Sequence, residues 1–161
     1  MISEELKKII KDYKDFPTKG IVFKDILPLF QNPYLFQEVV NKMSDDNLFK
    51  EADAIICIDA RGFIFGTAIA LKLKKPLIFA RKPGKLPGKL ITGDYQLEYG
   101  KNSLSIQKEA IEKYDSFVIV DDILATGGTV DCIVKMIEAS NKKIVGLSVF
   151  AELLFLKGRE K

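Results

Sequence analysis

Short apolar runs alternate with segments of helical periodicity along the chain from residue 53 onward. The runs at 54–58, 77–80, 117–120 and 144–151 are continuously apolar, which is typical of strands buried on both faces. Segments 63–73 and 130–139 lie between these runs and have helical spacing. This alternation predicts an α/β fold in which helices flank a central parallel sheet.

The first 45 residues follow a different pattern. They predict an amphipathic helix over 3–13, an extended segment at 20–28 and a second helix over 34–43. The apolar face of the first helix would carry Leu6, Ile9, Ile10 and Tyr13. We expect residues 1–45 to form a small hood within a single domain that spans 1–161.

Residues 81–107 interrupt the alternation of strands and helices. This segment contains two prolines and four glycines, which favour turns over regular elements. Insertions of this length are frequently active-site loops. The sequence therefore predicts a long flexible catalytic loop that acts as a lid.

Composition excludes several classes of protein. Of 161 residues, 47% are apolar and 29% are charged, which fits neither a disordered nor a membrane protein. A net charge of +3 is too small to indicate binding to duplex nucleic acid. The longest strongly apolar stretch, 62–71, is about half of the ~20 residues that cross a bilayer. Because the N-terminus also lacks the features of a signal peptide, we expect a cytoplasmic protein with no nucleic-acid or membrane partner.

The chain contains no histidine and only two cysteines. The missing histidine excludes Ser-His and Cys-His catalysis and His-ligated zinc, and two cysteines alone cannot build a structural zinc site. Cys57 and Cys132 each lie within an apolar or helical pattern, so we expect buried free thiols.

The segment 117–129, FVIVDDILATGGT, carries the strongest chemical signal. It reads as a buried strand, two acids, a glycine turn between threonines and the start of a helix. Ligands of open parallel sheets bind at the carboxyl ends of the strands, where glycines let backbone N–H groups approach an anion near the positive helix N-terminus. The predicted phosphate-binding loop comprises Ala125, Thr126, Gly127, Gly128 and Thr129.

Asp121 and Asp122 immediately precede this loop. A carboxylate that faced the phosphate would repel it, so we expect these side chains to accept hydrogen bonds from sugar hydroxyls. The alternative is a turn that needs only a flexible glycine and a capping threonine, but two adjacent acids serve no capping purpose.

This stretch resembles the phosphoribosyl-diphosphate signature of the type I phosphoribosyltransferase family. Three further stretches are similar to its adenine-specific members: FPTKGIVFKDILPL at 16–29, DARGFIFG at 59–66, and RKPGKLPG with LEYGK within 81–101. The C-terminal ELLFLKGREK is also similar, so the resemblance covers nearly the whole chain. It implies the type I phosphoribosyltransferase fold. It also implies purine salvage, in which adenine and 5-phospho-α-D-ribose 1-diphosphate give AMP and diphosphate.

Basic residues complete the expected diphosphate site. Arg61 follows the strand at 54–58 and lies at the same edge of the sheet, where a guanidinium can bind diphosphate bidentately. Lys82 and Lys85 would add further contacts from the lid. The alternatives are an Arg61 paired with a surface carboxylate and a merely solvated basic loop.

The resemblance implies the remaining roles. Glu98 would be the catalytic acid/base at the imidazole edge of the purine, and Tyr99 would pack near the reacting sugar. The Val22, Phe23 and Lys24 segment would bind adenine, because an extended backbone can match its N1 acceptor and N6 donor while the Phe23 ring stacks. The alternative is that 21–23 is simply core. Many members have Arg at the position of Lys24, so only a backbone role is carried over there.

The implied cofactor is Mg²⁺, held mainly by the substrate, with no metal site on the protein. The family suggests a homodimer, and the apolar segment Leu153–Leu156 is expected to be buried against the hood of its own chain or across a dimer interface. Two rival functions stay open at this point. One is transfer to hypoxanthine or guanine, and the other is a non-catalytic phosphoribosyl-diphosphate-sensing regulator, which would not need the Glu98 lid.

Overall fold

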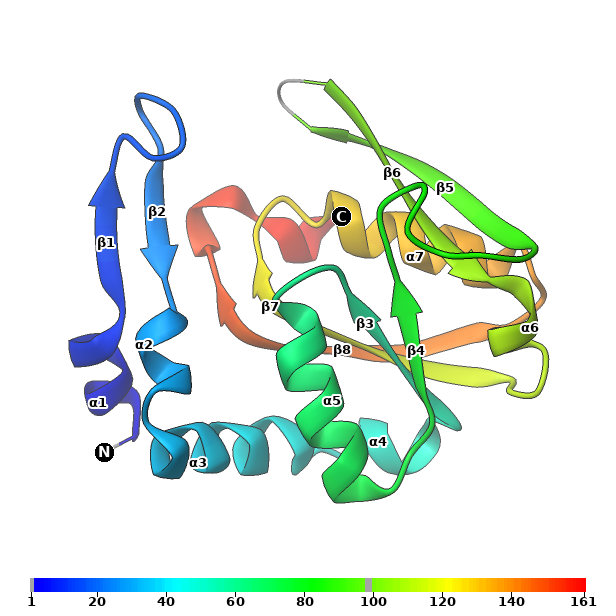
Figure 1. The fold of residues 1–161 in the computed structure, drawn as a ribbon, viewed down its shortest axis with the longest axis horizontal. Helices are drawn as coiled ribbons and strands as arrows, with labels where there is room; N and C mark the ends of the chain where they lie inside the picture. The colour runs from blue at the N-terminus through cyan, green and yellow to red at the C-terminus, as the bar shows by residue number, and fades with distance from the viewer. Residues whose placement is uncertain (1, 98–99) are drawn as a thin grey trace. The chain divides into compact units, whose positions relative to one another are not determined.

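The computed structural model describes residues 2–97 and 100–161 (Figure 1). The chain divides into two compact units, Met1–Lys42 and Met43–Lys161. In the described ranges, no helix combines the length and the apolar character needed to cross a membrane.

The N-terminal unit combines helices with a two-stranded ribbon. Its elements are α1 (Ile2–Ile9), β1 (Lys11–Lys14), β2 (Val22–Asp25), α2 (Leu27–Phe30) and α3 (Pro33–Ser44), the last of which ends in the second unit. The helix predicted over 34–43 is thus confirmed. Its start is capped by the side-chain oxygen of Asn32, which accepts the Leu35 N–H at 3.1 Å.

The helix predicted over 3–13 is wrong in its second half. α1 ends at Ile9, and the residues of β1 pair antiparallel with β2. Asp12 lies opposite Lys24 in this ladder, and their side chains form an ion pair of 2.6 Å. The spacing of apolar residues within 3–13 cannot reveal that a strand further along the chain pairs with this segment. The pairing with β2 decides the structure of 11–14 against the helical pattern.

The second unit is built on a four-stranded parallel sheet in the order β4-β3-β7-β8. The strands are β3 (Ala54–Ile58), β4 (Leu77–Ala80), β7 (Ser116–Leu124) and β8 (Lys143–Glu152). The helices are α4 (Leu48–Glu51), α5 (Gly62–Leu73), α6 (Lys108–Ile111) and α7 (Gly128–Glu138), and two short 3₁₀ turns follow, η1 (Leu154–Leu156) and η2 (Gly158–Glu160). The predicted parallel α/β sheet flanked by helices is therefore confirmed.

Helices α5 and α7 cover opposite faces of this sheet. Ile56 and Phe117 form the core together with Ile133 of α7. The alternate face packs on α5, where a Cβ atom at Gly66 would lie 2.5 Å from the Cβ of Cys57. Because every position of β3 is buried, the strand reads as a continuous apolar run rather than an alternating one.

The two cysteines are buried free thiols, as the sequence predicts. Burial raises the pKa of the Cys57 thiol to about 12. A thiol with so high a pKa stays protonated near neutral pH and is a poor nucleophile.

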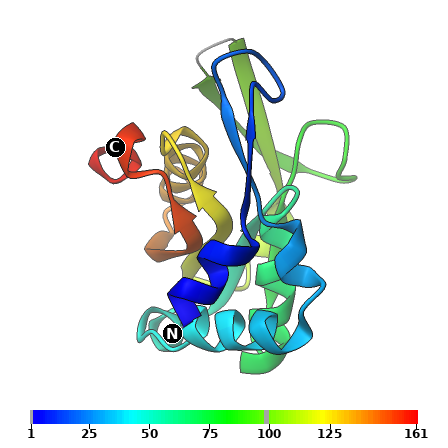
Figure 2. The ribbon, with the colours of Figure 1, turned by 90° about the vertical axis from the view of Figure 1, so that its left-hand side faces the viewer.

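The segment predicted as a long loop over 81–107 is largely a β-hairpin. Its strands are β5 (Leu90–Leu97) and β6 (Gly100–Gln107), and only 81–89 is a loop (Figures 1 and 2). Ile91, Gly93 and Tyr95 are more buried than Thr92 and Asp94 between them, so β5 does alternate between two faces. The glycine and aspartate hid that alternation, because both residues are rare in strands.

Asp53 ties the start of β3 to the start of β7. Its Oδ2 accepts the N–H of Asp115 at 3.0 Å, the N–H of Ser116 at 2.9 Å and the Ser116 hydroxyl at 3.0 Å. The hydrogen bonds from Asp115 and Ser116 lower the pKa of the Asp53 carboxyl from its usual 3.8.

We expect Asp53→Ala to lower the urea midpoint of unfolding at neutral pH. The folded pKa lies below 3.8, so the stabilisation by Asp53 is present above pH 3.8 and is lost as the pH falls through the folded pKa. The difference between wild type and variant should therefore shrink in acid. Urea titrations at several pH values measure it, with the exposed Asp45→Ala as control. A difference that does not change with pH would contradict this role of the carboxylate.

Candidate functional site

The strand order places the carboxyl ends of β3 and β7 at a switch point, where open parallel sheets form a ligand-binding crevice. From this central pair, β3 connects through α5 to β4 on one side, and β7 connects through α7 to β8 on the other. The two connections leave in opposite directions, and the point between them is where open parallel sheets bind ligands. Residues 59–62 after β3 and 121–129 at the end of β7 thus lie at the same edge.

The structure brings three predicted site residues together in this crevice. Arg61 Nε lies 2.6 Å from Asp122 Oδ2, and both side chains are mostly buried. Asp121 is next to them, and its Oδ1 accepts the Asp122 N–H at 2.8 Å. Gly62 makes this packing possible, because a Cβ atom there would lie 2.7 Å from Asp121 Oδ1. Arg61 is therefore paired with a carboxylate of the site itself.

The environment of Asp121 favours its protonated form. Burial, with the negative charge of Asp122, raises the pKa of Asp121 from 3.8 to about 8, and Arg61 opposes this only in part. In the free protein this side chain can therefore donate a hydrogen bond as well as accept one.

The sequence reasoning missed Arg81 and Asp59. Arg81 follows β4, and its Nε lies 3.2 Å from Asp59 Oδ2, while its guanidinium lies 5.6 Å from the centre of the Phe63 ring. The same side chain donates to the Lys85 carbonyl at 3.4 Å. Arg81 thus links the end of β3 to the 81–89 loop. Its position directly after the predicted buried strand at 77–80 could have marked Arg81 as a candidate site residue. The neighbouring Asp59–Ala60 peptide is cis.

The predicted phosphate-binding loop has the expected local geometry. Gly127 caps α7 with φ 78°, a left-handed conformation that favours glycine. The N–H groups in the first turn of an α-helix have no acceptor within the helix, so those of α7 face the loop as donors. Thr126 is exposed and Gly128 is buried. The residues can therefore offer N–H groups and a hydroxyl to an anion.

Strand β5 of the β5–β6 hairpin packs on α7, the helix that begins at this loop. Burial raises the pKa of the Tyr95 phenol, and the neighbouring Thr129 side chain opposes this rise only in part. A Cβ atom at Gly93 would lie 2.7 Å from Cys132 Sγ and 2.8 Å from Met136 Cγ. The β5–β6 hairpin and the 125–129 loop therefore adjoin the same helix, a link that the sequence reasoning did not detect.

The remaining predicted residues are distributed over three places. Lys82 and Lys85 are exposed on the 81–89 loop, and Glu98 and Tyr99 lie outside the described residues. Val22, Phe23 and Lys24 belong to β2 of the N-terminal unit. The Phe23 ring packs edge-on against Phe16 at 5.2 Å, and the Lys24 ammonium is held by Asp12, so the Lys24 side chain has a structural partner.

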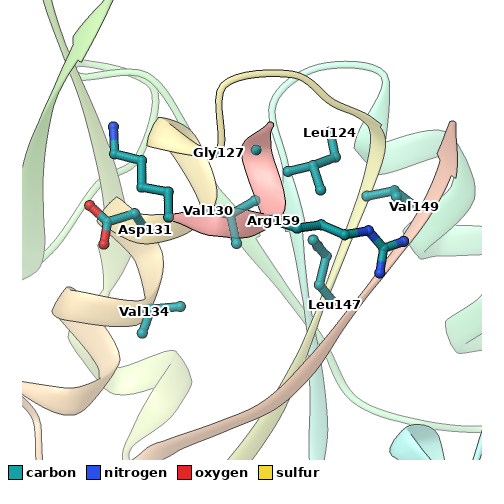
Figure 3. A pocket seen from close by; sticks show the side chains of 10 residues that line it. Leu124, Gly127, Val130, Asp131, Val134, Leu147, Val149 and Arg159 are labelled. Carbon is teal, nitrogen blue, oxygen red and sulfur yellow. The ribbon is translucent and has the colours of Figure 1, made fainter. Parts of the chain in front are cut away.

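A pocket of about 440 Å³ lies behind the phosphate loop. Figure 3 shows its lining by α7, β8 and the C-terminal turn. It is lined by Leu124, Gly127, Val130, Asp131, Val134, Leu147, Val149, Gly158, Arg159 and Lys161. Of the predicted site residues only Gly127 is among these, so this pocket is distinct from the crevice between β3 and β7.

Known proteins match this architecture closely. A family model described as a phosphoribosyl transferase domain matches residues 29–159. A protein named adenine phosphoribosyltransferase, from Prochlorococcus marinus (strain MIT 9211), is 60% identical over 159 residues, which are 99% of this chain and 92% of that protein. The chain belongs to the adenine phosphoribosyltransferase family.

Solved structures of this adenine phosphoribosyltransferase family agree with the assignment and with the type I fold. The Saccharomyces cerevisiae enzyme, complexed with an imino-altritol bisphosphate and adenine, matches with a TM-score of 0.90 and 39% identity, covering 99% of this chain and 93% of that one. The Trypanosoma brucei enzyme, in complex with AMP, pyrophosphate and ribose-5-phosphate, matches with a TM-score of 0.88 and 27% identity, covering 99% and 71%.

The raised pKa of Asp121 leads to a prediction about stability. Its folded pKa of about 8 lies above the usual 3.8, so ionisation destabilises the fold: the cost is absent below pH 3.8 and complete above about pH 8. Asp121→Asn resembles the protonated acid. The variant should therefore gain stability relative to wild type as the pH rises from about 5 to about 9.

Thermal unfolding of both proteins across this pH range measures the effect. Asp45→Asn is the control, because Asp45 is an exposed aspartate. A constant difference between Asp121→Asn and wild type would show that Asp121 is already ionised in the folded state at low pH.

Proposed function

We propose that this chain transfers the phosphoribosyl group of 5-phospho-α-D-ribose 1-diphosphate to N9 of adenine, giving AMP and diphosphate in purine salvage. The observation that carries the proposal is the crevice between β3 and β7, where Arg61 and the Asp121–Asp122 pair adjoin the phosphate loop. The identity of 60% to a protein named adenine phosphoribosyltransferase supports it.

The two ends of the substrate require different chemistry. The 5′-phosphate would bind the N–H groups of 126–129 at the start of α7. Asp121 and Asp122 would accept hydrogen bonds from the ribose hydroxyls. Arg61 would bind the diphosphate, with Lys82 and Lys85 joining it from the exposed loop. Arg61 Nε is paired with Asp122 in the free protein, and the guanidinium carries further N–H groups with which it would bind the diphosphate.

The donor set fits a Mg²⁺ ion that is bound mainly through the substrate. The described residues contain no group of three or more His, Cys, Asp or Glu side chains placed to hold a metal, and Asp121 and Asp122 are the carboxylates that would lie beside the ribose. When bound, the ion would neutralise charge on the diphosphate.

The reaction breaks the bond between C1 and the diphosphate oxygen and forms the bond from C1 to N9. Positive charge develops on the sugar while negative charge develops on the leaving group. Arg61, Lys82 and Lys85 would stabilise the leaving diphosphate, and the aspartates would hold the ribose for attack. The proton on N9 leaves during this step, and Glu98 would accept it.

Adenine would be recognised by the backbone of β2. In a two-stranded antiparallel ribbon every second residue turns its N–H and C=O away from the partner strand. The outer edge of Val22, Phe23 and Lys24 therefore offers donors and acceptors in fixed order, which matches N1 and N6 of adenine. A ketopurine reverses that order and would leave polar groups unpaired. A fixed backbone edge of this kind therefore disfavours hypoxanthine and guanine.

We also propose that the chain acts as a homodimer in the cytoplasm. Leu154 and Phe155 are 75% and 78% exposed in the single chain, and a second copy would bury them. Exposed apolar side chains next to each other mark interfaces.

The first test compares purines. With wild-type chain, 5-phospho-α-D-ribose 1-diphosphate and Mg²⁺, we expect AMP from adenine and at least roughly 10²-fold lower kcat/KM with hypoxanthine or guanine. Omission of Mg²⁺ should abolish most of the activity. Binding of the diphosphate substrate without turnover of any purine would support the sensor alternative instead.

The second test addresses the acid/base. Glu98→Gln should lower kcat by roughly 10²–10⁴-fold, while the affinity for the diphosphate substrate changes little. The exposed Glu109→Gln is the matched control. Near wild-type turnover of the Glu98 variant would remove this residue from the catalytic role.

A further inference from the structure

The C-terminal turn is tied to the strand that leads into the phosphate loop. Glu152 pairs with Leu124 at the end of the β7–β8 ladder, and the Leu153 N–H donates to the Leu124 carbonyl at 2.9 Å. Arg159 Nε then lies 2.6 Å from Glu152 Oε2. These contacts fold residues 153–160 back onto the start of the loop.

Gly158 in this turn touches the loop backbone to backbone. A Cβ atom at Gly158 would lie 2.3 Å from the carbonyl oxygen of Ala125, and one at Gly127 would lie 2.5 Å from the carbonyl oxygen of Gly158. Both values are too short for any side chain. Because both positions are glycine, the backbone of the C-terminal turn can pack directly against the backbone of the loop. This contact lies behind the residues that would bind the anion.

The contact fixes the direction of a donor on the opposite side of the loop. The Ala125–Thr126 peptide is trans, and in a planar trans peptide the C=O and the following N–H point in opposite directions. Since the Ala125 carbonyl faces Gly158, the Thr126 N–H points away from the C-terminal turn. Any displacement of that carbonyl turns the N–H with it.

Beside this turn, the loop borders a cavity. The pocket of about 440 Å³ adjoins both Gly127 and Gly158 (Figure 3). On the side that faces this pocket, the glycine contact and the bonds that hold the turn therefore support the loop.

We propose that Gly158 is a positioning residue for substrate binding. The C-terminal turn holds the Ala125 carbonyl and thereby aims the Thr126 N–H at the 5′-phosphate of the substrate. The inference rests on the proposed function, because it takes the loop to be the 5′-phosphate site. Gly158 itself touches no substrate.

Gly158→Ala tests the proposal. The added methyl group must push the Ala125 carbonyl away and misdirect one donor. We expect KM for the diphosphate substrate and Kd for AMP to rise roughly 10- to 100-fold, as for a lost hydrogen bond to a charged group. The change in kcat and in KM for adenine at saturating diphosphate substrate should stay within about threefold, because neither depends on this donor.

Gly146→Ala is the matched control. Gly146 lies in β8, and a Cβ atom there would lie 2.7 Å from Leu48 Cδ1, so the variant crowds the same unit away from the loop. It should lower the thermal midpoint without raising KM for the diphosphate substrate. If Gly158→Ala leaves KM within about twofold of wild type, or raises it no more than Gly146→Ala does, the proposal is wrong.

Arg159→Ala decides the question if Gly158→Ala does not fold. It removes the ion pair with Glu152 without a clash and should raise KM for the diphosphate substrate about two- to fivefold, the effect of one surface ion pair. An unchanged KM would then overturn the proposal. Failure of this proposal and failure of the proposed function can be told apart. If the wild-type chain makes no AMP, the proposed function is wrong. Calorimetry with AMP still tests the role of Gly158, because it measures whether the variants bind AMP more weakly than the wild type does.

Discussion

The parallel pairing of β3 with β7 is the constraint on which the site depends. Ala54 lies opposite Phe117 and Cys57 opposite Val120, so both strands end at the same edge, and the residues that follow them are neighbours in space. Asp53 secures this register at the opposite end through three hydrogen bonds to residues 115 and 116. A slip by one residue would bury the wrong faces of both strands and separate Arg61 from Asp122.

Most of the sheet could be predicted from the sequence, because strands buried on both faces leave an unmistakable apolar run. The strands predicted at 54–58 and 77–80 have those bounds in the structure. Segments whose structure depends on a distant partner were less predictable. β1 forms only by pairing with β2. Gly93 and Asp94 are of residue types that favour turns, but they lie inside β5, where they pair with β6.

The candidate site shows the same division. Asp121, Asp122 and the loop at 125–129 come from one continuous motif, and their placement follows from the strand–turn–helix pattern. The partner of Arg61 did not follow, since β3 and β7 are about sixty residues apart in the sequence. Arg81 and Tyr95 were missed for a related reason: each acts through a contact with another element, and neither belongs to a recognisable local motif.

The narrow contact at Gly93 constrains how the sequence can change. This position on β5 leaves no space for a Cβ atom against Cys132 and Met136 of α7, and α7 begins at the candidate phosphate-binding loop. A larger residue at 93 could be accommodated only with smaller residues at 132 or 136, or with a shifted helix. Related sequences should therefore covary at these positions, so that substitutions in the hairpin are accompanied by substitutions in the helix.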